Sequence, residues 1–426
     1  MLNNYNIMIG FLQIAIILIV AIILGQIIKK MGQPVIVGEL LAGILLGPSI
    51  LKYISPILFD KIFPNNTAAS SELNFFIQFG MILFMFVSGL KINKTLISNR
   101  KRVVFLTSLF GMIIPLLLGI STVLFIPSIL NGPAEKNTSI IYAFFIGIAL
   151  SISALPIIIR TLDDLNLSES EIGTIIIGSA TIDDIVGWTM FACLINASMS
   201  KGSVVSISLS IIKTFIFILV LFTAGVRVCR FVFYFINRYI QNSTIHISII
   251  IIMLMLVSTI AESIGIHPFF AAFLLGITLK NDIDNSITLS NAKKIIGAIA
   301  TSIFTPLYFT SLGMKVNLIK DFNLLLVLIV LLIAFLGKIA GASIGAFIGG
   351  VGWKEAFVIG ISMNSRGAVE IIIASAAVEL NIIGQQMYVA LIVMAVFTSL
   401  VSGSVLKKYY VDKNVSVRQS DRTDIL

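Results

Sequence analysis

Thirteen apolar segments, separated by short polar stretches, constrain this chain more than any other feature. A helix of ~20 apolar residues is long enough to cross the hydrocarbon core of a bilayer, and a helix satisfies its own backbone hydrogen bonds there. We therefore predict an all-α integral membrane protein with thirteen transmembrane helices, of which the ninth is short and the tenth is interrupted by Pro306 and Gly313. Their predicted limits are 7–28, 34–51, 73–90, 103–128, 139–160, 171–198, 204–226, 243–263, 267–280, 296–314, 322–349, 355–378 and 384–406.

The composition agrees with a surface that faces lipid. Charged residues make up 12% of the 426 residues, and hydrophobic residues make up 58%, whereas a soluble domain carries roughly 25% charged residues. The net charge of +9 is therefore interpreted through its distribution across the membrane, and no nucleic-acid partner is expected. Two distant cysteines, Cys193 and Cys229, and two histidines favour neither a disulfide framework nor a resident metal site. No cofactor is expected.

Basic residues are unequally divided between the two sides of the predicted membrane. With thirteen spans, the odd-numbered loops and the C-terminus share one side, which holds twenty lysines and arginines against six on the other. Basic loops remain in the cytoplasm. Segment 7–28 lacks a basic region before it and is too long for a signal peptide, so it is the first span. We expect a multi-pass protein of the cell membrane with its N-terminus outside and a short polar tail, 407–426, in the cytoplasm.

Two short sequence matches indicate an internal repeat. Gly89–Asn93, at the end of the third span, matches Gly313–Asn317 at the end of the tenth, and Gly43–Gly47 in the second span resembles Ala272–Gly276 in the ninth. Both pairs lie seven spans apart, and because seven is odd the copies have opposite orientations, as in alternating-access transporters. The predicted membrane domain, 1–406, thus comprises inverted repeats at about 7–198 and 243–406, joined by a linker helix at 204–226.

Charged residues inside spans are the strongest functional candidates, because a charge at mid-bilayer costs at least about 2.5–3.5 kcal/mol on insertion scales. Lys213 can place its ammonium group at the membrane surface and is given no role. The others are Glu39, Asp183, Asp184, Lys338, Arg366 and Glu370.

Asp183 and Asp184 lie near the middle of the sixth span. Adjacent residues on a helix diverge by about 100°, so the two carboxylates face different partners. Their proximity and their burial both disfavour ionisation, which lets protons compete with a cation for the same oxygens, and carboxylate oxygens suit Na⁺ or Li⁺. The pattern predicts a site for a transported monovalent metal cation and protons. The alternative is a structural pair bonded to neighbouring helices.

Lys338, deep in the eleventh span, is a natural counter-ion for one of these aspartates. Released from that pair when a cation binds, it would itself carry a transported proton; the alternative is a structural salt bridge. Glu39 lies near the cytoplasmic end of the second span and either lines an access funnel or has a structural role.

Two spans contain sequences that favour a break. Pro156 removes a backbone hydrogen bond from the fifth span, and Asn364–Gly367 favours an unwound segment in the twelfth. Interrupted helices in corresponding positions of two halves point to the binding site of a transporter. Arg366 and Glu370 are four residues apart and share one helix face. If their role is structural, they pair with each other. The predicted broken-helix core comprises Ser151, Ser153, Pro156, Asn364, Ser365, Arg366 and Glu370.

These residues carry a resemblance to a known family. Val37–Pro48, the stretch from Thr181 to Trp188, Gly337-Lys338 and Ser365–Gly367 are similar to segments of the second cation:proton antiporter family, which includes NapA-type and Kef-type proteins. The resemblance covers about residues 7–406 and implies an NhaA-like fold with two crossing broken helices. It also implies a homodimer in which each subunit has a dimerisation part and a mobile core part.

The resemblance assigns roles to individual residues. Asp184 resembles the main ion-binding and proton-carrying carboxylate, and Asp183 resembles the partner of Lys338 in NapA-type relatives. An Asp-Asp pair with this lysine is associated with electrogenic exchange of one cation for two protons. Kef-type proteins usually have Gln-Asp at this position and a large nucleotide-binding domain, so they match less well. NapA-type relatives commonly place a glutamate two residues after the arginine, whereas here it is Glu370.

Three alternatives to a cation:proton antiporter were weighed. A channel or a sodium-coupled symporter of the same fold would share the buried charges, although a symporter needs more polar groups in the crossing helices. An intramembrane aspartyl protease needs two aspartates that face each other across a water molecule. Asp183 and Asp184 are adjacent on one helix, and no Gly-x-Gly-Asp motif occurs, so an enzyme is not expected.

Overall fold

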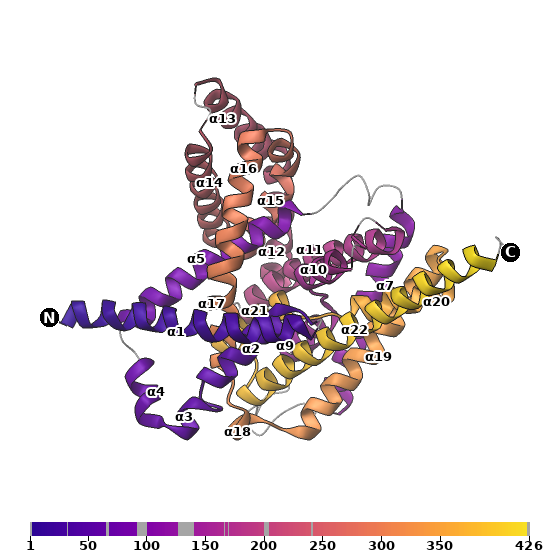
Figure 1. The fold of residues 1–426 in the computed structure, drawn as a ribbon, viewed down its shortest axis with the longest axis horizontal. Helices are drawn as coiled ribbons and strands as arrows, with labels where there is room; N and C mark the ends of the chain where they lie inside the picture. Colours follow the sequence, from indigo (N-terminus) through magenta and orange to yellow (C-terminus); the bar gives the residue numbers. More distant parts are fainter. Residues whose placement is uncertain are drawn as a thin grey trace. The chain divides into compact units, whose positions relative to one another are not determined.

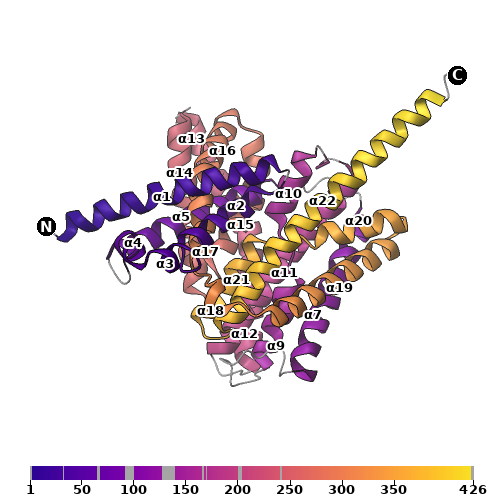
Figure 2. The same ribbon diagram turned by 60° about the horizontal axis from the view of Figure 1, so that its bottom comes forward.

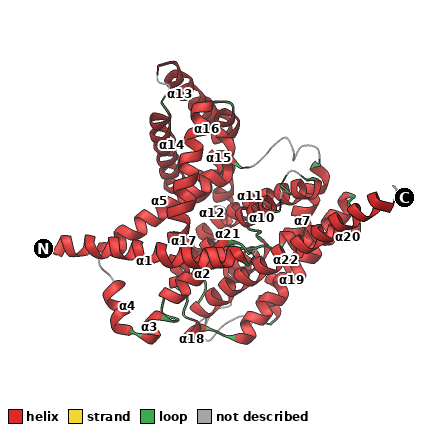
Figure 3. Cartoon of the chain, in the orientation of Figure 1, coloured by secondary structure: helices red, strands yellow, loops and turns green. Residues whose placement is uncertain are grey.

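The computed structural model describes residues 2–31, 33–64, 68–91, 100–126, 140–165, 167–168, 170–199, 204–239 and 242–423. Every regular element in these ranges is helical (Figure 3). Each of the thirteen predicted segments overlaps one helix or one interrupted pair of helices. Ten described helices are long and apolar enough to cross a membrane, and the other three predicted spans are the short ninth and the two interrupted ones.

The chain divides into two compact units (Figure 1). Unit 1 comprises Met1–Leu24, Glu39–Ile92 and Trp188–Asn317, and unit 2 comprises Gly25–Gly38, Asn93–Gly187 and Leu318–Leu426. Helices with most of their residues in unit 1 are α1 (Leu2–Lys30), α2 (Val35–Leu46), α3 (Leu51–Ile54), α4 (Pro56–Ile62), α5 (Ala68–Leu90), α12 (Val204–Val220), α13 (Val226–Tyr239), α14 (Ser243–Ser263), α15 (Pro268–Asp284), α16 (Ile287–Ile299) and α17 (Thr305–Met314). Those of unit 2 are α7 (Lys101–Phe125), α9 (Ile140–Ser151), α10 (Leu155–Asp164), α11 (Glu171–Met199, as far as Gly187), α18 (Leu318–Asp321), α19 (Leu324–Gly349), α20 (Trp353–Met363), α21 (Ala368–Glu379) and α22 (Gln385–Thr423).

Three predicted helix limits are wrong by more than two helical turns. The seventh span continues beyond residue 226 to Tyr239 through a π-helical turn, Leu221–Gly225. The tenth begins at Ile287, and neither Pro306 nor Gly313 ends it, because a second π-helical turn, Ala300–Phe304, accommodates the proline near the start of α17. The tail does not leave the helix at residue 406, since α22 continues to Thr423; residues 424–426 lie outside the described ranges.

Glycine contacts in unit 1 bear on the predicted repeat. A methyl group at Gly43 would clash with the Thr310 carbonyl oxygen and the Gly313 Cα, and one at Gly276 would clash with the corresponding atoms of Phe86 and Gly89. Helix α2 therefore packs on α17 as α15 packs on α5, an exchange of partners that agrees with the predicted inverted repeat.

The same contacts correct the register of one sequence match. Gly276 occupies the place of Gly43, whereas the sequence comparison aligned Gly43 with Ala272, one helical turn away. The match of Gly89 with Gly313 has the register that the packing requires, although residues 92 and 93 of that match lie outside the described residues.

In unit 2, α7 and α19 lie side by side (Figure 2). Gly337, Gly341 and Gly345 recur every fourth residue along α19 and contact the backbone of α7. Small residues at this spacing let two membrane helices approach closely, which is how such helices gain packing energy without a hydrophobic driving force. The close contact holds Lys338, which follows the first of these glycines, inside the unit.

Both predicted breaks are present in unit 2. Helices α9 and α10 are separated by Ile152–Ala154, and α20 and α21 are separated by Asn364–Gly367. The two interruptions touch, because the backbone N–H of Ala154 donates to the carbonyl oxygen of Ser365 at 2.8 Å. Irregular backbone at membrane depth is tolerated only where protein or a polar cavity satisfies it, so this contact helps to stabilise both breaks.

Candidate functional site

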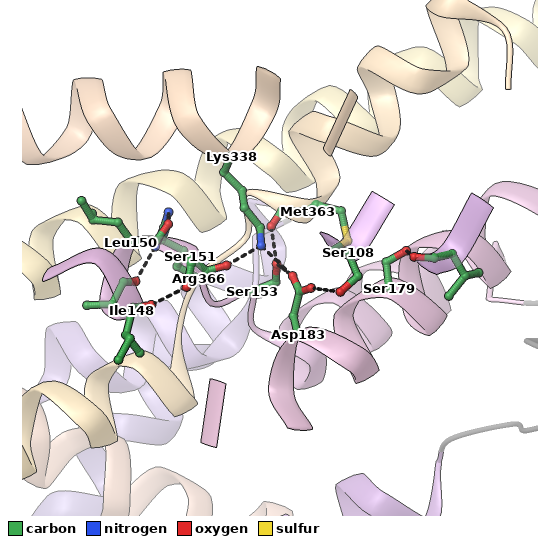
Figure 4. A network of polar contacts seen from close by, with 12 residues as sticks. Ser108, Ile148, Leu150, Ser151, Ser153, Ser179, Asp183, Lys338, Met363 and Arg366 are labelled. Carbon is green, nitrogen blue, oxygen red and sulfur yellow. Dashed lines mark hydrogen bonds and ion pairs between the residues drawn. The ribbon is translucent and has the colours of Figure 1, made fainter. Parts of the chain in front are cut away.

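Asp183 lies on α11 and is fully buried. Its Oδ1 atom accepts a hydrogen bond from Ser108 on α7 at 2.6 Å. Its Oδ2 atom lies 2.9 Å from the hydroxyl of Ser153 in the first break and 2.6 Å from Nζ of Lys338 on α19 (Figure 4). Side chains from three other elements thus converge on this one carboxylate. Three donors and one full positive charge stabilise its ionised form.

The Ser153 hydroxyl has two acceptors in reach. Besides Asp183, it lies 2.8 Å from the carbonyl oxygen of Met363, the last residue of α20 (Figure 4). A serine hydroxyl has a single proton, so it donates to only one of the two at a time. Ser153 therefore connects Asp183 to the carboxyl end of the other broken helix.

Side chains satisfy the carboxyl end of α9. A helix leaves its last four carbonyl groups without intrahelical partners. The Ser151 hydroxyl donates to the carbonyl oxygen of Ile148 at 2.8 Å, and Lys338 donates to that of Ser151 at 2.5 Å. Arg366 donates to the remaining two, with Nη1 at 2.7 Å from the Ala149 oxygen and Nη2 bonded to that of Leu150.

Lys338 and Arg366 therefore place two positive charges at the negative end of the α9 dipole. This arrangement explains how a helix can end within the membrane-embedded core without leaving unpaired carbonyl groups. Because Lys338 also bonds Asp183, the carboxyl end of α9 and the Asp183 carboxylate share one ammonium group.

Arg366 forms a second ion pair, with Glu370 in the first turn of α21. Nη1 and Oε1 lie 3.6 Å apart, and both side chains are buried. Neither oxygen of Glu370 has a hydrogen-bond partner among the described residues. Arg366 and Glu370 therefore pair, as the structural alternative supposes, but Arg366 lies in the break and does not share a helix face with Glu370.

Asp184 differs from its neighbour. Its side chain is 1% exposed, and neither of its oxygens has a hydrogen-bond partner in the part of the chain that the structure describes. Of the five buried charged groups gathered here, Asp183 pairs with Lys338 and Glu370 pairs with Arg366. When it is ionised, Asp184 adds a negative charge that these two pairs leave uncompensated.

Other predicted residues have different environments. Asn364 and Ser365 are buried in the second break, and their side-chain polar atoms have no hydrogen-bond partner among the described residues. Pro156 is the second residue of α10, and its side chain lies outside the described set.

Glu39 belongs to unit 1, where its side chain is buried and its carbonyl oxygen accepts a hydrogen bond from the Thr310 hydroxyl at 3.0 Å. Its role in an access funnel stays a prediction.

Sequence reasoning missed Ser108, the second hydroxyl that contacts Asp183. The other site residues are marked by an intramembrane charge or by a broken helix, and α7 has neither a break nor a charge in its interior. Hydroxyl residues within an otherwise apolar span were the sequence feature that could have identified Ser108.

No cluster of three or more histidine, cysteine, aspartate or glutamate side chains that suits a metal ion occurs in the described ranges. The transported monovalent metal cation expected at Asp183 and Asp184 stays a prediction.

Comparison with known proteins decides the family. Residues 14–411 match the family described as sodium/hydrogen exchanger, transmembrane. The chain belongs to this family. It is therefore a multi-pass membrane transporter and not an enzyme, as the resemblance of its motifs predicted.

Similar proteins include the Na(+)/H(+) antiporter NhaS4 of Synechocystis, 30% identical over 93% of this chain and 96% of that protein. The probable Na(+)/H(+) antiporter GerT of Bacillus cereus is 26% identical over 95% of this chain and 100% of that protein. The K(+)/H(+) antiporter 1 of Saccharomyces cerevisiae is 26% identical over 94% of this chain but only 46% of that protein, so this chain spans about half of some relatives.

The fold is also similar to a solved structure. The sodium proton antiporter MjNhaP1 from Methanocaldococcus jannaschii superposes with a TM-score of 0.70 at 15% sequence identity, covering 95% of this chain and 97% of that one. This likeness confirms the expected all-helical exchanger fold.

Proposed function

We propose that the chain exchanges a monovalent cation for protons across a membrane, and that Asp184 is the carboxylate for which both compete. The observation that carries the proposal is the contrast between the two adjacent aspartates. Asp183 accepts hydrogen bonds from Ser108 and Lys338, whereas Asp184 is equally buried and has no hydrogen-bond partner among the described residues.

Charge balance explains why one site serves both ions. Burying an uncompensated carboxylate is expensive, so Asp184 is stabilised by either one monovalent cation or one proton. When either ion is bound, the carboxylate is neutral and does not bind the other. If the carrier changes the side to which the site is open only when the carboxylate is neutral, the empty, charged form cannot make that change. Each cycle then carries a cation in one direction and a proton in the other.

Lys338 is the proposed second proton carrier. It is fully buried and held by Asp183 and by one backbone carbonyl. A cation that draws Asp183 into its coordination shell would free this ammonium group, and a buried unpaired ammonium gives up its proton readily. One cation would then exchange for two protons, which makes transport electrogenic.

Sodium is the favoured cation, with potassium and lithium as further candidates. Carboxylate and hydroxyl oxygens, such as those of Asp183, Ser108 and Ser153, suit hard monovalent cations. The names of NhaS4 and GerT specify sodium, and that of the yeast relative specifies potassium.

The proposed setting is the cell membrane, with the N-terminus outside, the C-terminus in the cytoplasm and two chains forming a homodimer. The distribution of lysine and arginine supports this orientation. Many large apolar side chains are exposed, as expected of a surface in contact with lipid.

The test is ion flux in proteoliposomes that contain the purified protein and an imposed pH gradient. Exchange predicts that added sodium dissipates the gradient, and that the Asp184→Asn variant does not support this signal. Cation flux without proton movement would indicate a channel, and flux that requires a third solute would indicate a symporter.

A further inference from the structure

The connector between the second and third spans exposes apolar side chains. It consists of α3 and α4, which belong to unit 1. Because α2 ends and α5 begins there, the connector lies at one surface of the membrane. Ile57 is 85% exposed, Ile54 is 75% exposed and Tyr53 is 71% exposed, and Leu58 beside them is also exposed. These four residues form the connector patch. Apolar surface of this kind is unfavourable in water, so the patch requires a partner.

Helix α4 is amphipathic, and its other face holds it to the rest of unit 1. Phe59 and Phe63 are buried, with their ring centroids 5.7 Å apart. The side-chain amide of Gln13 on α1 donates to the carbonyl oxygen of Ile62, the last residue of α4, at 2.8 Å. Packing and a hydrogen bond thus fix α4 against α1. The connector patch therefore occupies a fixed position at the surface of unit 1.

Helix α1 has an exposed apolar surface beside this connector. Its segment Ile7–Lys30 is long and apolar enough to cross a membrane, and Met8, Phe11 and Leu12 at the start of that segment are exposed. Apolar side chains exposed on a spanning helix face lipid. Because Gln13 bonds α4, the connector lies next to this lipid-facing surface (Figure 2). The surface that contacts lipid therefore extends from α1 to the connector.

Charged side chains flank the connector patch and favour lipid over a protein partner. The Lys52 ammonium lies 3.7 Å from the Asp60 carboxylate and 5.1 Å from the centroid of the Phe59 ring, and Lys61 is exposed. At a bilayer surface, charged groups stay in water while apolar neighbours enter the acyl region, and tyrosines such as Tyr53 are enriched there. The core of a protein interface is instead depleted of charged residues.

We propose that the connector patch inserts into the boundary between headgroups and acyl chains and anchors unit 1 at a fixed depth in the bilayer. The partner is the lipid bilayer itself. Ile54 and Ile57 enter the apolar layer just below the headgroups, and Lys52, Asp60 and Lys61 remain in water. The anchor requires no bound ion and is independent of the proposed function.

Tryptophan fluorescence in brominated lipids tests the depth of the patch. The reporters are Ile57→Trp and the more conservative Tyr53→Trp, each in the Trp353→Phe background, in which the one remaining native tryptophan is the buried Trp188. Proteoliposomes carry bromine either near the headgroup end of the acyl chains or near their terminus. The reporters should lose roughly half of their emission to shallow bromine and less to deep bromine, because an interfacial apolar face lies about 5–10 Å into this boundary.

Two matched controls bracket the expected depth. Lys61→Trp, on the polar side of the same helix, should be quenched little by either lipid, and Ile19→Trp, exposed on α1, should be quenched more by deep bromine than by shallow bromine. Ile54→Asp adds a charge within the patch. It should reduce the quenching of Ile57→Trp to that of Lys61→Trp, with the melting temperature in detergent unchanged because the Ile54 side chain is exposed.

Three results would overturn this inference. Equal quenching of Ile57→Trp and Lys61→Trp would show that the patch stays in water, and stronger quenching of Ile57→Trp by deep bromine would place it within the hydrocarbon core. Disulfide cross-linking of Ile57→Cys between two chains in a cysteine-free background, without quenching of Ile57→Trp, would show that a second copy of the chain covers the patch. None of these results bears on the proposed function, which ion flux tests separately.

Discussion

The ammonium nitrogen of Lys338 lies 2.6 Å from Oδ2 of Asp183, and both side chains are fully buried. The same nitrogen donates to the carbonyl oxygen of Ser151, so one lysine joins the carboxyl end of α9 to the carboxylate on α11. Asp184, one residue further along, has no such partner among the described residues. Substitutions at the two adjacent aspartates should therefore affect stability in opposite directions.

Asp184→Asn should abolish exchange without lowering thermal stability in detergent. The substitution keeps the shape of the side chain and removes a buried charge that has no hydrogen-bond partner, so the melting temperature should be unchanged or higher. Exchange is measured in proteoliposomes and unfolding by a thermal shift of the purified protein. Near-normal exchange would contradict the assignment of Asp184 as the ion-binding carboxylate.

Asp183→Asn should lower the melting temperature, because it leaves the buried ammonium of Lys338 without its counter-ion. Breaking a buried ion pair from one side costs about 3–5 kcal/mol. The double variant Asp183→Asn/Lys338→Met removes both charges and should recover part of the loss. If instead the single variant is as stable as the unmodified protein, the pair does not stabilise the fold.

Much of this fold was predictable because few backbone structures are stable inside a lipid bilayer. A spanning segment that satisfies its own backbone hydrogen bonds is a helix, and it needs a minimum number of apolar residues to cross the hydrocarbon core. The thirteen segments could therefore be located by hydropathy. The breaks before Pro156 and at Asn364–Gly367 were predictable because a proline and a run of small polar residues weaken a helix locally. That Lys338 pairs with one of the two aspartates followed from the small number of charges inside the spans, and the choice of Asp183 was implied by the family resemblance.

Other features depend on contacts that no local pattern specifies. The satisfaction of the α9 carbonyl groups by Arg366 and Lys338 joins residues that are more than 180 positions apart. The register of Gly43 with Gly276 depends on backbone approach, which a comparison of apolar letters cannot resolve. The different roles of Asp183 and Asp184 were implied by family resemblance and stay a prediction, to which the geometry adds that Asp183 has hydrogen-bond partners whereas Asp184 has none among the described residues.

Ser153→Ala should destabilise the core by about 1–3 kcal/mol, because two buried acceptors lose their shared donor. Ser153→Thr keeps the hydroxyl and should retain most of the exchange rate. Ser179→Ala on α11 is the control, since this buried serine donates to the carbonyl oxygen of Val104 at 3.1 Å and not to Asp183. Exchange rate and melting temperature are measured together. Equal effects of Ser153→Ala and Ser179→Ala would exclude a special connection between Asp183 and Met363.

Arg366→Lys should destabilise the carboxyl end of α9 although the charge is retained. The guanidinium group donates through two nitrogen atoms to the carbonyl groups of Ala149 and Leu150. The single ammonium group of a lysine side chain does not reproduce that geometry. Backbone amide hydrogen exchange should therefore accelerate in the last turn of α9, while the control Arg100→Lys on the exposed surface should leave it unchanged. Unaltered exchange in α9 after Arg366→Lys would indicate that another group satisfies these carbonyls.

The corresponding glycine contacts in unit 1 predict matched effects at distant positions. Gly43→Ala and Gly276→Ala should each lower stability by about 1–3 kcal/mol through overpacking, and by similar amounts, because their surroundings correspond atom for atom. Combined, they should be additive, since they belong to separate contacts. Gly43→Ala with Gly313→Ala should be non-additive, because both alter one contact. Gly10→Ala, in open surroundings, should be neutral or stabilising. Additive losses for the Gly43–Gly313 pair, measured by thermal unfolding in detergent, would be inconsistent with direct backbone contact between α2 and α17.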